Sequence, residues 1–199
     1  MMLKQSKIST PVLTERVQRV QPSATLTISA KAMALKAQGI DIISLSAGEP
    51  DFDTPDHIKE AGIQAIQKGQ TKYTPVDGTP ELKDAIVNKF SQDNNLLYKP
   101  ENILVSSGAK QTCFNLFQAV LEHGKEAVII SPYWVSYPDM VLLANGSPVI
   151  LKTSFENNFQ FNAEDLDSVL TENTRLLMLN SPSNPTGVTY TRDQYQIIA

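Results

Sequence analysis

The stretch EAVIISPYWVSYP, residues 126–138, decides the fold. Its residues Ala127–Ile130 form an unbroken apolar run, which is typical of a β-strand buried on both faces. Pro132 and Pro138 then frame a segment that carries the aromatic residues Tyr133, Trp134 and Tyr137. A buried strand followed at once by a rigid aromatic loop predicts a parallel sheet with a candidate binding loop at the end of one strand.

Other short apolar segments repeat this pattern along the chain. Leu176–Leu179 is a second continuous run, and Val149–Leu151 is a further predicted strand. Ile103–Val105 and Ile40–Leu45 are shorter strand candidates. Helical patterns lie between these segments, so strand and helix alternate as in βαβ units. We therefore expect an α/β fold with a mainly parallel sheet and helices on both of its faces.

Helix start and stop signals divide the rest of the sequence. Thr54 with Pro55, and Thr79 with Pro80, each supply an N-cap residue followed by a proline suited to the first helical position. Residues 1–29 are mixed and polar, and we expect them to form an arm. The expected helices are Ala30–Gln38 before Gly39, the helix after Pro55 that Gly69 closes, the helix after Pro80 with Leu82, Ile86 and Phe90 on one face, the stripe from Cys113 to Leu121 before Gly124, a short helix after Asn162, and a helix opened by the capping box of Thr191 and Gln194.

The composition excludes several classes of protein. Of the 199 residues, 41% are hydrophobic and 19% are charged, and the net charge is −4. The acidic balance argues against a nucleic-acid-binding surface, and no run approaches the length of about 20 apolar residues that a membrane helix needs. Cys113 is the single cysteine and cannot form an internal disulfide. We expect a cytoplasmic protein with neither nucleic-acid nor membrane partners.

The sequence also lacks the spacing of a metal site. His57 lies near a helix start and His123 near a helix end, where solvation or end-capping explains them. No cluster of cysteine, histidine and carboxylate residues has ligand spacing, so we expect no metal.

The loop Ser106–Lys110 lies between a predicted strand and a helix. Free N–H groups at a helix start suit a phosphate, Gly108 and Ala109 leave room for close approach, and Lys110 adds a cation. The alternative is an ordinary turn of small residues with a solvated lysine, because one glycine is a weak signal without a Walker or dinucleotide fingerprint.

Two loops after other predicted strands offer ligand-binding groups. Trp134 is the only tryptophan and offers a flat ring for stacking on a planar ligand. Asn184 precedes Pro185, which favours extended geometry, and its amide both donates and accepts hydrogen bonds. The alternatives are aromatic residues that seal the edge of a core and a simple turn rich in proline and glycine. Gly48, with an unobstructed backbone N–H, and Tyr73, with a phenol that can reach a phosphate oxygen, complete the candidate set.

Taken together and in this order, these loops resemble those of the class I aminotransferases of fold type I, which use pyridoxal phosphate. The resemblance is strongest to the bacterial aspartate aminotransferase subgroup, some of whose members also accept prephenate. It spans about residues 15–190. It is carried by Gln21–Thr25, Ser46–Asp53 with its Gly48-Glu49-Pro50 core, Thr71–Tyr73, Gly108–Gln111, Ser131–Pro138 and Asn180–Gly187.

The resemblance implies how pyridoxal phosphate is held. Gly108, Ala109 and Lys110 cradle the phosphate with backbone N–H groups, Trp134 stacks on the pyridine ring, and Asn184 hydrogen-bonds the phenolic O3′. The family commonly has glycine or serine at the position of Ala109, and alanine is tolerable there if the residue keeps a helical φ.

The resemblance also implies substrate contacts and a second copy of the chain as partner. The Gly48 backbone meets the substrate α-carboxylate, and Lys110, with Ser23 and Thr25 nearby, recognises a distal carboxylate. Trp134 and Asn184 also belong to the substrate site. Tyr73 reaches the phosphate bound by the neighbouring subunit, so a homodimer with shared active sites is expected.

The resemblance implies a domain division as well. Residues 1–45 form an arm and part of the small domain, and residues 46–199 form the N-terminal portion of the cofactor-binding large domain. The family's Schiff-base lysine, its aspartate on the pyridinium nitrogen and its arginine on the α-carboxylate match nothing in this sequence. We expect them downstream, so that the chain is the N-terminal half of an enzyme and is inactive alone. We assign no catalytic residue within it.

The activity expected from the resemblance is transamination between an amino acid, aspartate, and a 2-oxo acid such as 2-oxoglutarate. The alternatives are a prephenate or aromatic aminotransferase, a C–S lyase on the same scaffold, and a non-catalytic truncated binding module. A Rossmann-type nucleotide-binding domain is disfavoured, since its glycine-rich fingerprint is missing after the first strand.

Overall fold

The computed structural model describes residues 12–46 and 48–199. Residues 1–11 of the expected arm, and Ala47 of the Gly48 loop, lie outside the described residues. The chain divides into two compact units, one made of the residues up to Ser23 together with Cys113–Ala199, and the other of Ala24–Thr112. The division falls within a single helix, α5 (Ala109–Val120).

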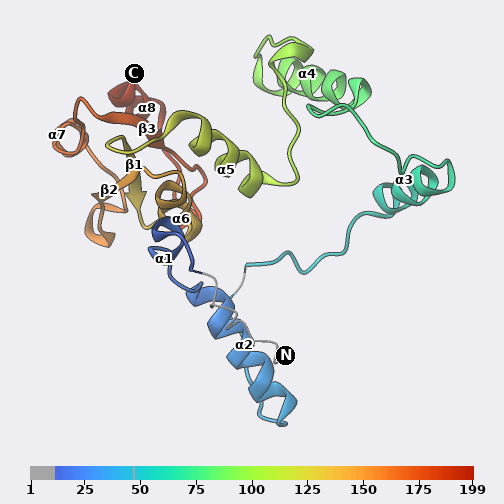
Figure 1. The fold of residues 1–199 in the computed structure, drawn as a ribbon, viewed down its shortest axis with the longest axis horizontal. Helices are drawn as coiled ribbons and strands as arrows, with labels where there is room; N and C mark the ends of the chain where they lie inside the picture. The colour runs from blue at the N-terminus through green and yellow to red at the C-terminus, as the bar shows by residue number, and fades with distance from the viewer. Residues whose placement is uncertain (1–11, 47) are drawn as a thin grey trace, which may run out of the picture. The chain divides into compact units, whose positions relative to one another are not determined.

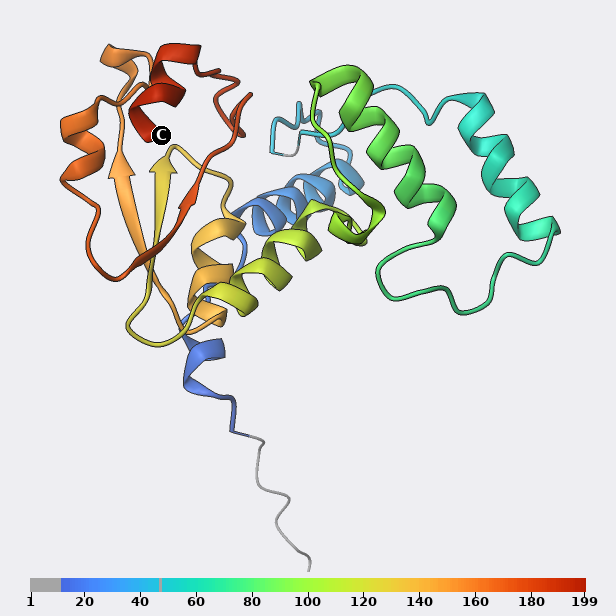
Figure 2. The same ribbon diagram turned by 90° about the horizontal axis from the view of Figure 1, so that it is seen from above.

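A parallel sheet forms the centre of the first unit. Its strands are β1 (Glu126–Ser131), β2 (Ser147–Lys152) and β3 (Thr174–Met178), in the order β2-β1-β3. Both pairings are parallel (Figures 1 and 2). Ile129 of β1 lies opposite Ile150 of β2 and Met178 of β3. The three predicted strands and their parallel arrangement are therefore confirmed.

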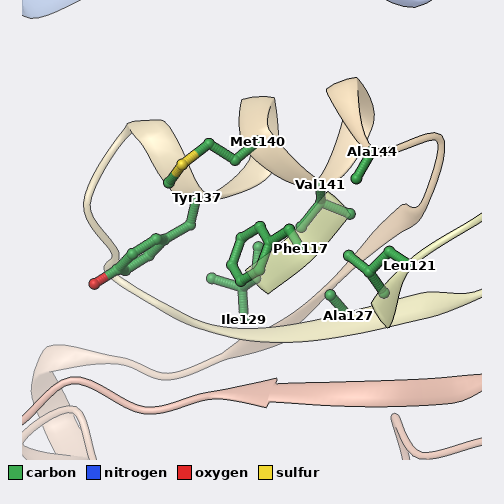
Figure 3. Close-up of a cluster of buried hydrophobic side chains, with 8 residues drawn as sticks. All are labelled: Phe117, Leu121, Ala127, Ile129, Tyr137, Met140, Val141 and Ala144. Carbon is green, nitrogen blue, oxygen red and sulfur yellow. The ribbon is translucent and has the colours of Figure 1, made fainter. Parts of the chain in front are cut away.

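Alternate residues of β1 supply two separate cores. Ala127 and Ile129 pack on one face against Phe117 of α5, against Leu121 just after that helix, and against residues of α6 (Ser136–Leu143). Figure 3 shows this cluster, with the Phe117 ring lying among side chains from the strand and both helices. A strand covered on both faces needs a continuous apolar run, which is why residues 127–130 show no alternation. Helix α6 and its C-terminal end contribute to the Phe117 cluster the side chains of Tyr137, Met140, Val141 and Ala144.

The other face of β1 is covered by later segments of the chain. Val128 and Ile130 pack with Leu151 of β2 and with Leu166 of α7 (Ala163–Asp167). Ile198 of α8 (Arg192–Ile198) is partly buried against this second cluster. Helical segments thus cover both faces of the sheet, as the sequence predicts.

Short helices of this unit begin where their caps predict. The Asn162 side chain accepts a hydrogen bond from the Asp165 N–H at 2.8 Å, and the Thr191 N–H donates to the Gln194 side chain at 2.7 Å. Both pairs are reciprocal capping boxes, which satisfy N–H groups that a helix start leaves without intrahelical acceptors. The remaining short elements are α1 (Glu15–Gln18) and the 3₁₀ turn η2 (Phe155–Asn157).

Longer helices dominate the described part of the second unit. These are α2 (Ala24–Ala37), α3 (Asp56–Gln67) and α4 (Pro80–Asn94), followed by the 3₁₀ turn η1 (Pro100–Asn102). Thr79 caps α4 by accepting from the Leu82 N–H, with Pro80 at the first helical position as predicted. Gly39 and Gly69 follow α2 and α3 with positive φ, the left-handed conformation typical of a residue just beyond a helix.

A buried lysine of α4 forms a hydrogen bond with the segment that precedes this helix. Lys83 is the one charged side chain that is buried among the described residues, and it donates to the Asp77 carboxylate. This hydrogen bond lowers the pKa of Asp77. The Asp77 carbonyl accepts from the Val105 N–H at 3.0 Å. A Cβ at Gly78 would lie 2.5 Å from Val105 Cγ2, so only glycine fits this close approach.

Two predicted strands are wrong. Ile40–Leu45 and Ile103–Val105 form no regular structure, and within the described residues neither pairs with a strand. An apolar run becomes a strand only if another chain segment satisfies its backbone N–H and C=O groups. The exposed fractions of Ile43 and Leu45 are 87% and 92%, so these side chains also lack the packing expected of a core strand.

Three predicted boundaries also differ. The helix expected from Ala30 begins at Ala24, because the threonines and isoleucine before Ala30 disfavour a helix only weakly. Pro55 rather than Thr54 occupies the N-cap position of α3, and no side chain caps it. The loop expected at Ser131–Pro138 is shorter, because α6 begins at Ser136.

Candidate functional site

The backbone around Trp134 is fixed by the start of α6. The Trp134 carbonyl accepts a hydrogen bond from the Tyr137 N–H at 3.1 Å. The Trp134 ring meets the Tyr137 ring edge-on, with centroids 5.3 Å apart and planes at 89°. Tyr137 is buried in the core, and burial raises the pKa of its phenol. The half-buried indole is therefore anchored along one side at the carboxyl end of β1.

The loop that carries Asn184 is closed by hydrogen bonds within itself. The Asn184 N–H donates to the Asn180 side-chain oxygen at 2.7 Å. The Ser183 N–H donates to the Val188 carbonyl at 2.8 Å, and the Gly187 N–H donates to the Ser183 carbonyl at 2.7 Å. These bonds hold the loop without tying up the Asn184 side chain, which is exposed and whose amide forms no hydrogen bond among the described residues.

The structure brings these two loops together. They follow β1 and β3, which are adjacent and parallel, so both leave the same edge of the sheet. A cavity of about 10 Å³ lies between them, lined by Pro132 and Tyr137 from one side and by Asn180, Ser183 and Asn184 from the other. This volume suits one water molecule, so a larger ligand would lie against the loops and not inside the cavity.

The Gly108 loop keeps only part of what the phosphate cradle needs, because the Gly108 N–H donates to the Ser106 carbonyl at 2.8 Å and the Ser107 N–H donates to the Gln111 side chain. Gly108 has a φ of +86° directly before α5, and a Cβ built on it would meet no atom within 4 Å. Gly108 is therefore uncrowded, and it lies beside a helix start whose N–H groups and dipole favour an anion. Ala109 is the first residue of α5, so it has the helical conformation that its side chain requires.

The other predicted residues lie at element ends or in loops of their own units. Ser23 directly precedes α2 and Thr25 is its second residue. Gly48 and Tyr73 are exposed in loops on either side of α3, and Tyr73 is fully exposed. That these residues and the Gly108 loop share one site with Trp134 and Asn184 stays a prediction.

Taken one by one, the predicted residues match the chemistry of a flat ring that bears a phosphate and a phenolic oxygen. The start of α5 at Ala109 offers backbone N–H groups, Trp134 offers an aromatic face, and the Asn184 amide forms no hydrogen bond within the part of the chain that the structure describes. Each group of pyridoxal phosphate thus has a chemically matching residue. By contrast, the described residues hold no cluster of three or more histidine, cysteine, aspartate or glutamate side chains that could bind a metal ion.

Two residues that hold the site were missed by the sequence analysis. Asn180 accepts the hydrogen bond from the Asn184 N–H, and Thr153, after β2, donates its hydroxyl to the Ser131 carbonyl at the end of β1. An asparagine that opens a loop rich in proline is a known signal for side-chain to backbone bonding, so Asn180 could have been found. Thr153 carries no local signal, because its partner is distant in sequence.

The chain belongs to the aminotransferase class I and II family, whose sequence model matches residues 40–199. It is 51% identical over 188 residues to an aspartate aminotransferase of Bacillus sp. strain YM-2, covering 94% of this chain and 48% of that protein. It is 52% identical over 186 residues to an aspartate/prephenate aminotransferase of Nitrosomonas europaea, covering 94% of this chain and 47% of the relative.

A solved structure agrees with this assignment. The aspartate aminotransferase from Thermus thermophilus with maleate has a TM-score of 0.91 and 46% sequence identity, over 95% of this chain and 50% of that one. The chain therefore spans about half the length of the relatives it matches. Over residues 12–46 and 48–199, no helix is long and apolar enough to cross a membrane.

Proposed function

We propose that this protein takes part in transamination with pyridoxal phosphate, moving the amino group of aspartate to a 2-oxo acid such as 2-oxoglutarate. The observation that carries the proposal is the meeting of the Trp134 and Asn184 loops at one sheet edge in a chain of the aminotransferase family. The names of the Bacillus and Nitrosomonas relatives support aspartate as the amino donor.

Each residue has a proposed task in holding the cofactor. Gly108, Ala109 and Lys110 bind the phosphate through the start of α5, and Trp134 supports the ring from one face. Asn184 donates its amide hydrogen to the phenolic oxygen. When bound, pyridoxal phosphate supplies an electrophilic carbon for the amino group and a ring that withdraws electrons.

The proposed substrate contacts use other residues. The Gly48 N–H binds the α-carboxylate, and Lys110 pairs with the distal carboxylate, with Ser23 and Thr25 beside it. A buried carboxylate needs a cation as partner, so this arrangement favours dicarboxylic substrates. Trp134 and Asn184 border the same substrate space.

We also propose a homodimer in the cytoplasm. The fully exposed Tyr73 ring supports an intersubunit contact, because a phenol that packs on none of the described residues is available to a second copy. The division into a small-domain part, residues 1–45, and a large-domain part, residues 46–199, belongs to this proposal too.

The test is an assay of the protein expressed from its own gene, beside the 199-residue chain alone. With pyridoxal phosphate and 2-oxoglutarate, the former should convert aspartate to oxaloacetate, measured by coupled oxidation of NADH. We expect the 199-residue chain to show no turnover, because it lacks a lysine in the Schiff-base motif. Absence of turnover with the product of the whole gene would contradict the proposed function.

A second candidate is transamination of prephenate, which the name of the Nitrosomonas relative supports. The same assay with prephenate as acceptor and aspartate as donor distinguishes the two. Turnover with prephenate exceeding that with 2-oxoglutarate would favour the second candidate.

Replacing Lys110 by alanine should lower kcat/KM more for dicarboxylic amino donors than for apolar ones. Loss of a charge-assisted hydrogen bond should lower kcat/KM for aspartate as amino donor by about ten- to a hundredfold. With the amino acid alanine as donor, kcat/KM should fall by about threefold or less, because this donor has no distal carboxylate. Steady-state kinetics with both amino donors measure the difference. Lys68→Ala, an exposed lysine at the end of α3, is the matched control. Equal losses for both donors would remove Lys110 from recognition of the distal carboxylate.

A further inference from the structure

Asn180 lies where β3 ends and where the Asn184 loop begins. It is half-buried, and its side-chain oxygen accepts the Asn184 N–H at 2.7 Å. This distance is at the short end of the range for a neutral N–H···O hydrogen bond. The bond closes a ring around Ser181, Pro182 and Ser183, and both asparagines line the same small cavity.

The other hydrogen bonds of the loop hold different residues. The Ser181 hydroxyl accepts from the Tyr190 N–H at 3.3 Å, and Ser183 is bonded to Val188 and Gly187. Among the described residues, the bond from Asn180 is the one that directly holds the backbone of Asn184. Asn184 is otherwise exposed, so packing does little to fix it.

We propose that Asn180 is a positioning residue, which holds Asn184 so that its side-chain amide meets the phenolic oxygen of the cofactor. This inference rests on the proposed function. Hydrogen-bond strength falls steeply with distance and angle, so a loosened Asn184 donates less well. A donor that stabilises the ionised phenolic oxygen lowers the pKa of the bound chromophore, and weakening the donor raises that pKa.

The first readout needs no cofactor. Backbone amide exchange at Asn184, followed by NMR on protein expressed from its own gene, should become about five- to tenfold faster in Asn180→Ala, since one hydrogen bond is lost. Asn180→Asp keeps an acceptor oxygen in the same place and should retain slow exchange. Ser181→Ala is the matched control, because it should speed exchange at Tyr190 and leave Asn184 unchanged.

The second readout is the absorption of bound pyridoxal phosphate as a function of pH. In Asn180→Ala, the pH of the spectral transition should rise by about half a unit or more, while Ser181→Ala keeps the transition of the unaltered protein. A purely structural role would lower thermal stability in both variants without moving the transition.

The two readouts separate failure of this inference from failure of the proposed function. Unchanged exchange at Asn184, or an unchanged transition, in Asn180→Ala would overturn the inference while the function stands. If the unaltered protein binds no pyridoxal phosphate, the proposed function falls, and the role of Asn180 toward the cofactor falls with it.

Discussion

Replacing Trp134 by alanine is expected to raise the dissociation constant of pyridoxal phosphate about tenfold or more. The Trp134 backbone carbonyl accepts from the Tyr137 N–H just after β1, and the indole itself makes edge-on contact with the Tyr137 ring. It therefore offers a preorganised aromatic face, and alanine removes both the stacking and the apolar area buried against the ring. Equilibrium dialysis or absorbance titration with the protein expressed from its own gene measures the change.

Trp134→Phe is the matched control for this result. Phenylalanine keeps a flat ring and should restore most of the affinity, with a loss of about threefold. Trp134→Ala also loses the contact with Tyr137, so thermal unfolding without cofactor should accompany each titration. Equal affinities for the unaltered protein and Trp134→Ala, in samples that remain folded, would remove Trp134 from the cofactor site.

Replacing Phe117 by alanine should lower the free energy of unfolding by about 3–5 kcal/mol. The Phe117 side chain is 0% exposed and lies at the centre of the cluster between β1, α5 and α6 (Figure 3). Alanine leaves a cavity that these neighbours fill only partly, so the loss exceeds the transfer free energy of the ring. Urea denaturation followed by circular dichroism measures it.

Phe114→Ala on the same helix is the control for the loss of a ring as such. Phe114 is 37% exposed, and its truncation should cost about 1 kcal/mol or less. A similar loss in the two variants would mean that the cluster around Phe117 is not the core of this unit.

The central strands could be predicted because burial on both faces leaves a direct mark in the sequence. Residues 127–130 are apolar at every position, since β1 contributes alternately to one cluster and to the other. Ile103–Val105 is also apolar throughout, and Ile40–Leu45 is mostly apolar, yet neither run forms a strand. Whether an apolar run becomes a strand depends on a partner segment, and no local pattern identifies that partner.

Helix α6 could have been found, although proline obscured it. Tyr137, Met140, Val141 and Ala144 repeat at helical spacing and face the Phe117 cluster. Pro138 suggests a loop, but in the first turn of a helix a missing N–H costs little, because those N–H groups lack intrahelical acceptors. The expected loop was extended to Pro138, whereas this proline lies in the first turn of α6.

The candidate site was predictable to the extent that it depends on strand ends. Trp134 and Asn184 follow neighbouring parallel strands, and topology alone brings their loops to one edge. The support from Asn180 was not predicted, although an asparagine that opens a proline-rich loop is a signal for side-chain to backbone hydrogen bonding. That Gly108 joins this edge is a separate expectation, which a bound ligand can test.

The most direct test of the account is the fluorescence of Trp134 during titration with pyridoxal phosphate. Trp134 is the only tryptophan, so the emission reports on one position. The account predicts a saturable loss of emission as the ring stacks, with a midpoint that inorganic phosphate moves to higher concentration by competing at the Gly108 loop. Emission that stays constant through the titration, or quenching that phosphate does not affect, would contradict a shared site for Trp134 and Gly108.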